Sequence, residues 1–155
     1  MISVLLVDDR PSIRRGLRMR LALESDLRVV GEAGDGLTAV SLVQELRPDV
    51  VLMDVAMPGL DGIAAAHALR TVAPESAVVL LTIYGDPHTR ARGKAADVAA
   101  FVDKQTQERL LVATIRQVTP RRDAPEPECL RRRAAAGARP VPTPKPKDVG
   151  LRPPK

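Results

Sequence analysis

Residues 50–54, Val50-Val51-Leu52-Met53-Asp54, form a short apolar run that ends in an aspartate. A second apolar run, residues 3–7, is followed at once by the pair Asp8-Asp9. If the two runs are neighbouring parallel strands, three carboxylates meet at one edge of a sheet. Like charges within about 4 to 6 Å raise one another's pKa and resist joint ionisation, so a cation is expected among them.

The whole chain, at 155 residues, has the length of one ordinary domain with one core. Its first apolar run has no basic leader and reaches two aspartates before signal-peptide length, and no run approaches the ~20 apolar residues of a membrane span. The single cysteine, Cys129, allows no internal disulfide, which is typical of a reducing compartment. We therefore expect a soluble, cytoplasmic protein that makes no membrane contact.

Charge is divided unevenly along the chain. Residues 1–119 contain 14 Lys and Arg against 15 Asp and Glu, whereas residues 120–155 contain 10 against 4. Nine of the 14 prolines lie in the second segment, which has no aromatic residue and few large aliphatic ones. Burial cannot offset the entropy of ordering such a segment. We expect a folded domain over 1–119 and a basic, Pro/Arg-rich disordered tail over 120–155.

Five β-rich runs alternate with helical patterns in residues 1–119, which predicts an α/β fold with a parallel sheet and helices on both faces. The runs are residues 2–7, 27–31, 50–53, 77–81 and 99–103. Right-handed crossovers place the carboxyl ends of parallel strands at one edge, where ligands bind in open sheets. Four runs end there in polar side chains: Asp8-Asp9, Asp54, Thr82 and Lys104. The sequence therefore predicts that these residues share one site.

This set of side chains suits phosphoryl transfer. Clustered carboxylates favour a hard cation such as Mg²⁺, which is typically held by one or two carboxylates with water and phosphate. Asp54 can act as a nucleophile toward phosphorus, because aspartyl phosphates are known covalent intermediates. Lys104 would place a positive charge, and Thr82 a hydroxyl donor, beside the phosphoryl oxygens. Phosphoryl transfer depends mainly on positioning and charge neutralisation, which these groups supply.

Several motifs in residues 1–119 resemble the receiver domain of two-component response regulators. They are Val7-Asp8-Asp9, Leu52-Met53-Asp54, Met57-Pro58-Gly59-Leu60-Asp61-Gly62, Leu81-Thr82 and Phe101-Val102-Asp103-Lys104. Residues 30–36 and 47–54 are in addition similar to the NarL/FixJ branch, which has LuxR-type output. The resemblance implies a flavodoxin-like, doubly wound sheet of five strands in the order 2-1-3-4-5, with five helices.

The same resemblance implies a phosphoacceptor and a metal site. Asp54 would be phosphorylated. Mg²⁺ would be held by Asp9, Asp54 and the carbonyl of Ala56, while Asp8 would act through water.

The remaining implied roles concern signalling. Thr82 and Lys104 would contact the phosphoryl group, and Thr82 would act with Phe101 as the conformational switch. A sensor histidine kinase would be the phosphodonor, and the signal would pass to a downstream protein by contact rather than by enzymatic turnover. Pairing into a homodimer is left open.

The fourth predicted helix, within residues 88–96, departs from the family pattern. It offers only alanines to the core, and its interior Gly93 costs about 1 kcal/mol relative to alanine, so we expect the helix to shorten or fray. The family usually has glycines ahead of the switch aromatic. Here Asp97 must take the left-handed conformation that ends the helix, which aspartate tolerates less well than glycine.

Two alternative functions remain open from the sequence. A transcriptional regulator of the NarL/FixJ type usually carries a helix-turn-helix after the receiver, but residues 120–155 show no apolar periodicity for one. The DNA-binding output would then be lost, or replaced by the basic tail. A phosphate-ester hydrolase with Asp54 as nucleophile would usually have a second aspartate two residues later, where this chain has Ala56.

Overall fold

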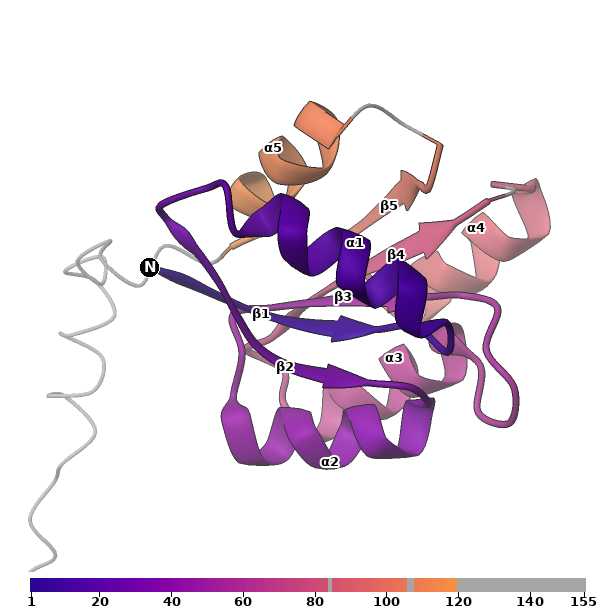
Figure 1. Ribbon diagram of the computed structural model, residues 1–155. Coiled ribbons are helices and arrows are strands. Elements are labelled where there is room, and N and C mark those ends of the chain that lie inside the picture. The colour runs from indigo at the N-terminus through magenta and orange to yellow at the C-terminus, as the bar shows by residue number, and fades with distance from the viewer. Residues whose placement is uncertain (84, 106–107, 120–155) are drawn as a thin grey trace, which may run out of the picture. The chain divides into compact units, whose positions relative to one another are not determined.

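The computed structural model describes residues 1–83, 85–105 and 108–119, which alternate between strands and helices (Figure 1). The strands are β1 (Ile2–Val7), β2 (Leu27–Ala33), β3 (Val50–Asp54), β4 (Ala77–Thr82) and β5 (Ala100–Asp103). The helices are α1 (Pro11–Leu21), α2 (Gly36–Leu46), α3 (Gly62–Val72), α4 (Pro87–Ala95) and α5 (Glu108–Val118). The predicted tail over 120–155, with Cys129, lies outside the described residues.

All five strands are parallel and lie in the order β2-β1-β3-β4-β5, which confirms the predicted flavodoxin-like topology. Every residue of the central strand β3 is buried. A strand covered on both faces needs apolar side chains at every position, which explains the unbroken run in its sequence. Strand order reverses between β1 and β3, and a crevice forms at such a point in open parallel sheets.

Two buried clusters lie on opposite faces of the sheet. Leu5 and Val7 of β1 pack with apolar residues of α2 and α3, whereas Val4 and Leu6 pack with residues of α1 and α5. Figure 1 shows these helix pairs on the two sides of the sheet. Because successive side chains of a strand point to opposite faces, consecutive residues of β1 pack into different buried clusters.

The helices begin and end at residue types that can be recognised in the sequence. Asp35, Asp61 and Asp86 are the N-caps of α2, α3 and α4, and each accepts a hydrogen bond from the backbone N–H three residues later. Pro11 occupies the start of α1, where its missing N–H costs nothing. Arg47, which precedes a proline, leaves the helical region with φ 46° and ends α2.

Helix α4 is nine residues long, against eleven in each of the other helices, so the prediction of a short helix is confirmed. The reason given for it needs correction. Gly93 is the buried residue of α4, and a Cβ on Gly93 would overlap the ring of Phe101. The glycine therefore makes room for an aromatic ring from β5. Asp97, just after the helix, has the expected left-handed backbone with φ 58°.

Strand boundaries differ slightly from the predicted ones. β2 continues to Ala33 because Val7 of β1 pairs with it, and β5 begins at Ala100. Asp54 and Thr82 are the last residues of their strands rather than the first residues beyond them. No helix in the described part of the chain is long and apolar enough to cross a membrane.

Candidate functional site

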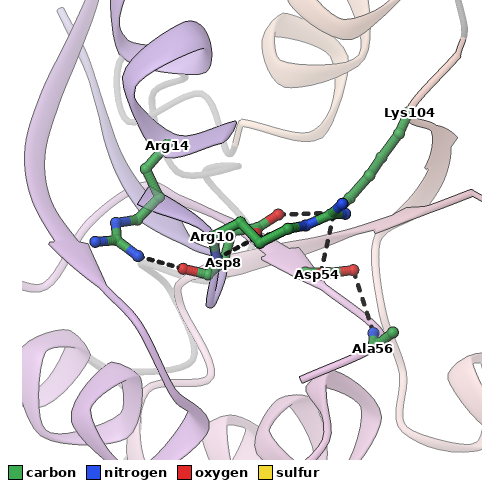
Figure 2. Close-up of polar contacts among 6 residues, drawn as sticks. All are labelled: Asp8, Arg10, Arg14, Asp54, Ala56 and Lys104. Atoms are coloured by element: carbon green, nitrogen blue, oxygen red, sulfur yellow. Dashed lines mark hydrogen bonds and ion pairs between the residues drawn. The ribbon is translucent and has the colours of Figure 1, made fainter. Parts of the chain in front are cut away.

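The candidate site lies at the carboxyl edge of the sheet, where three carboxylates converge (Figure 2). Asp8 and Asp9 follow β1, and Asp54 ends β3. One oxygen from each of the three carboxylates lies within 4.8 Å of the other two. The predicted meeting of these residues is thus present in the structure.

Lys104 provides a cation between two of these carboxylates. Its Nζ donates to Asp8 Oδ2 at 2.7 Å and forms an ion pair with Asp54 Oδ2 at 3.0 Å. The Lys104 side chain is only 11 % exposed. The backbone N–H of Lys104 donates to the carbonyl of Thr82. The hydrogen bonding between β4 and β5 therefore extends to Lys104 and fixes the position of its backbone.

Asp8 is held from several directions. Its Oδ1 accepts from the backbone N–H of Arg10 at 2.9 Å, and its Oδ2 accepts from Lys104. The guanidinium of Arg14 donates to the backbone carbonyl of Asp8. In contrast, Asp9 is exposed, and no hydrogen bond or ion pair joins its side chain to any other residue in the described part of the chain. Asp9 can therefore turn toward a cation without losing a contact.

The Asp54 carboxylate is buried and has an altered acidity. Its Oδ1 accepts from the backbone N–H of Ala56 at 3.2 Å. Burial raises the pKa of Asp54 above its ordinary value, Lys104 opposes this, and the charge of Asp8 adds to it. A cation close to Asp54 would favour the ionised carboxylate that a nucleophile needs.

The backbone beside Asp54 is tightly packed. The N–H of Gly62, the first residue of α3, donates to the carbonyl of Val55, and a Cβ on Gly62 would overlap the carbonyl oxygen of Asp54. A glycine is therefore required for α3 to begin this close to β3. The structure places Ala56 here through its N–H, while its carbonyl as a metal ligand stays a prediction.

A cavity of about 300 Å³ opens beside Asp54. Its lining includes Asp54, Thr82, Ile83, Arg10 and the start of α4 at Asp86 and Thr89. Thr82 is buried at the end of β4. Phe101 packs against the buried cluster that includes residues of α2 and α3 and Ala96, and it is not among the described residues that line this cavity; its part in the switch stays a prediction.

Two features of the cavity were missed in the sequence. Arg10 was overlooked, although it directly follows Asp8-Asp9 and precedes a proline, which holds it in an extended conformation at the sheet edge. The start of α4 was also overlooked. Asp86 followed by a proline is a helix-start signal, and Asp86 caps the helix through hydrogen bonds from Thr89.

The donor set fits Mg²⁺. It consists of hard oxygen ligands from the clustered carboxylates of Asp8, Asp9 and Asp54, of which Asp54 lines the cavity, and carboxylate oxygens are ligands that this ion prefers. Asp9 has free oxygens, and Asp54 faces the cavity, where water and phosphate oxygens can complete an octahedron.

Comparison with known proteins gives a consistent result. The response regulator receiver domain family matches residues 4–116. Response regulator GacA of Pseudomonas aeruginosa is 40% identical over 118 residues, which cover 76% of this chain and 55% of GacA. The uncharacterized transcriptional regulatory protein YhcZ of Bacillus subtilis is 38% identical over 117 residues, covering 76% of this chain and 54% of YhcZ.

A solved structure agrees with these relatives. The signal receiver domain of the putative response regulator NarL from Mycobacterium tuberculosis has a TM-score of 0.72 and 32% sequence identity, covering 75% of this chain and 94% of that domain. The chain spans about half the length of the curated relatives that it matches. From the match over most of its length and the shared fold, this chain belongs to the response regulator receiver domain family of two-component systems.

Proposed function

We propose that Asp54 accepts a phosphoryl group from a sensor histidine kinase with the help of Mg²⁺, and that the chain signals by a change of conformation. The observation that carries this proposal is the position of Asp54. Of the three clustered carboxylates, Asp54 alone lines the cavity, whereas Asp8 is 1 % exposed and bound by Lys104. A phosphodonor in the cavity would therefore meet Asp54 first.

The proposed metal ligands are Asp9, Asp54 and the carbonyl of Ala56, with Asp8 acting through water. When bound, Mg²⁺ supplies positive charge to the carboxylates and to the phosphoryl oxygens. The carboxylates of this chain would orient the ion, while the Ala56 N–H holds Asp54 Oδ1 and Lys104 contacts Asp54 Oδ2 until the phosphoryl group arrives.

In the transfer, Oδ2 of Asp54 attacks phosphorus and a new O–P bond forms. The P–N bond to the donor's histidine breaks, and its electron pair passes to the imidazole nitrogen. Lys104 exchanges its contact with Asp54 for one with a phosphoryl oxygen, and the Thr82 hydroxyl donates to another. The incoming group brings a charge of about −1.5 to −2, which these donors offset.

The signal would then pass through Thr82 and Phe101. Thr82 moves toward the new phosphoryl oxygens, and Phe101 responds because it lies on the adjacent strand, where Thr82 pairs with Asp103 and Leu80 with Phe101. The partner that reads this change is a downstream protein or a second copy of the chain. We assign the receiver to 1–119 and a separate basic tail to 120–155.

Control of transcription is the second candidate, because YhcZ is named a transcriptional regulatory protein. In this chain DNA would be contacted by the basic residues of 120–155, which include Arg131-Arg132-Arg133. Binding should then weaken steeply with salt and fall when these three arginines are replaced by alanine. Binding that the replacement leaves unchanged would contradict this role.

The main test is phosphorylation of the full chain by acetyl phosphate, measured by intact mass. One phosphoryl adduct is expected with Mg²⁺, and none with a chelator. The matched control is Asp54→Asn, which keeps the size of the side chain and removes the nucleophile, and it should gain no adduct. Repeated turnover of a small phosphate ester without a stable adduct would point instead to a hydrolase.

A further inference from the structure

We propose that Arg10 binds the phosphoryl group of small dianionic phosphodonors as they enter the cavity, an inference that rests on Asp54 being the acceptor. Arg10 comes directly after the two aspartates that follow β1, and it lines the cavity beside Asp54. Its role would be distinct from that of Lys104, which already contacts two carboxylates within the site.

The backbone of Arg10 is fixed, but its side chain is available. Its N–H donates to Asp8 Oδ1, and its extended backbone caps the start of α1. The side chain is 49 % exposed, and its Nε lies 4.0 Å from Asp8 Oδ1, which is longer than a hydrogen bond. In Figure 2 it extends from Asp8 toward Asp54 and Lys104, while Arg14 points to the opposite side of Asp8.

The charges around the cavity favour a second cation at this position. Among the described residues that line it, Arg10 is the sole Lys or Arg, whereas Asp54 and Asp86 are both acidic. Lys104 is paired with Asp8 and Asp54, is only 11 % exposed, and is not among the described residues that line this cavity. An anionic donor that approaches from solvent would therefore be repelled by two carboxylates, and Arg10 is the group placed to attract it before it reaches Lys104.

The chemistry of the guanidinium suits this task. Arginine stays protonated at all physiological pH values, and its planar fork of N–H donors can bind two phosphoryl oxygens at once. With acetyl phosphate, Asp54 Oδ2 attacks phosphorus, the bond between phosphorus and the acyl oxygen breaks, and acetate leaves with the electron pair. One carboxylate enters and another leaves, so no proton is transferred and the charge on the phosphoryl oxygens is what the protein must bind.

The test measures the phosphorylation rate as a function of acetyl phosphate concentration. It uses the full wild-type chain and three variants: Arg10→Ala, Arg10→Lys and Arg15→Ala. Arg15 is an exposed arginine of α1 that does not line the cavity, so its removal changes the net charge equally. Arg10→Ala should raise the half-saturating concentration about three- to tenfold, a range that reflects a charge-assisted contact screened by solvent. The half-saturating concentration of Arg10→Lys should lie between those of wild type and Arg10→Ala, and that of Arg15→Ala should equal the wild-type value.

A second donor separates charge recognition from damage to the site. Phosphoramidate carries less negative charge than acetyl phosphate at neutral pH, so Arg10→Ala should slow its reaction less. An equal loss with both donors, or an equal effect of Arg15→Ala, would overturn the role of Arg10. If all variants gain the adduct with the same saturation curve, Arg10 has no role and Asp54 remains the acceptor. Failure of the wild-type chain to gain any adduct would instead overturn the proposed function, and this inference with it.

Discussion

Gly93 of α4 lies so close to Phe101 of β5 that any side chain at position 93 would overlap the aromatic ring. The guanidinium of Arg90, on the same helix, lies 5.9 Å from the centroid of that ring, within cation–π range. The Nε of Arg90 also donates to the carbonyl of Gly85 at 3.2 Å. Phe101 therefore contacts two residues of α4, Gly93 and Arg90. Arg90 in turn contacts Gly85 in the loop that follows β4.

Gly93→Ala should lower the free energy of unfolding by up to about 2 kcal/mol. Forcing a methyl group against the ring costs about 1 to 3 kcal/mol, and the gain in helix propensity of about 1 kcal/mol offsets part of it. Urea denaturation of the single variants and of a double variant with Phe101→Ala provides the check. In the Phe101→Ala background the clash is gone, so Gly93→Ala should become neutral or stabilising. The same loss in both backgrounds would show that the ring is not the cause.

Asp54→Asn should stabilise the protein at neutral pH when a chelator is present. Burial raises the pKa of Asp54 in the folded state above the 3.8 of the unfolded chain. A carboxyl with a raised folded-state pKa favours folding when protonated, so its ionisation opposes folding as the pH rises through the folded-state pKa. The advantage of Asp54→Asn should be largest at neutral pH and should shrink as the pH falls toward 3.8.

Urea denaturation across this pH range measures the effect of Asp54. Mg²⁺ should stabilise the wild type more than Asp54→Asn, because ligand binding to the folded state adds to its stability. A difference between the two proteins that does not change with pH would contradict the assigned effect of burial on the pKa.

Asp61→Ala should lower the free energy of unfolding by about 1 kcal/mol, the usual value for a lost N-cap. Asp61 accepts from the backbone N–H of Ala64 at 2.8 Å and from Arg92 of α4 at 3.0 Å. Burial acts to raise the pKa of Asp61, but these two donors outweigh it and lower the pKa below 3.8. Its contribution to stability is therefore present above pH 3.8 and is lost as the pH falls through the lower folded-state pKa.

Hydrogen exchange separates the two roles of Asp61. Asp61→Asn keeps the cap and loses the charged contact, so α3 should stay protected while the amides of α4 exchange faster. Arg92→Ala is the matched variant on the other helix and should affect α4 alone. Unchanged exchange in α4 for both variants would mean that this ion pair does not hold the helix in place.

Asp97→Gly should raise the free energy of unfolding by about 0.5 to 1 kcal/mol. Asp97 has a left-handed backbone, which costs a non-glycine residue about 1 kcal/mol or more. Its ion pair with Arg70 is exposed and 3.7 Å long, and such pairs contribute little. Asp97→Ala keeps the strain and removes the pair, so it should be no more stable than wild type. Thermal unfolding of the two variants measures the difference, and equal behaviour would argue against backbone strain at this position.

The parallel sheet and the meeting of the site residues could be predicted because they depend on patterns within single segments, whereas the strand order was implied by the resemblance to receiver domains. The unbroken apolar run of β3 reports burial on both faces, and parallel topology then brings Asp8, Asp54 and Lys104 to one edge. The short α4 was also predicted, although the reason given for it was wrong, and the left-handed Asp97 was expected from comparison with the family pattern.

The features that were missed depend on contacts between distant side chains. Gly93 looked like a weak point in a helix, since nothing in the sequence shows that the ring of Phe101 occupies the space beside it. Arg10 was given no role from the sequence, because the cavity that it lines together with Asp54 is not visible there. Neither relationship has a sequence period or a fixed spacing that could reveal it.

The ion pair between Lys104 and Asp8 joins residues 96 positions apart in the chain. Loop closure over such a distance is slow compared with local helix formation. Until β5 joins the sheet, Asp8 and Asp54 lie beside each other without their lysine, so their mutual repulsion opposes the early pairing of β1 with β3. Docking of β5 would both complete the sheet and remove that repulsion, so we expect it to be coupled to the pairing of β1 with β3.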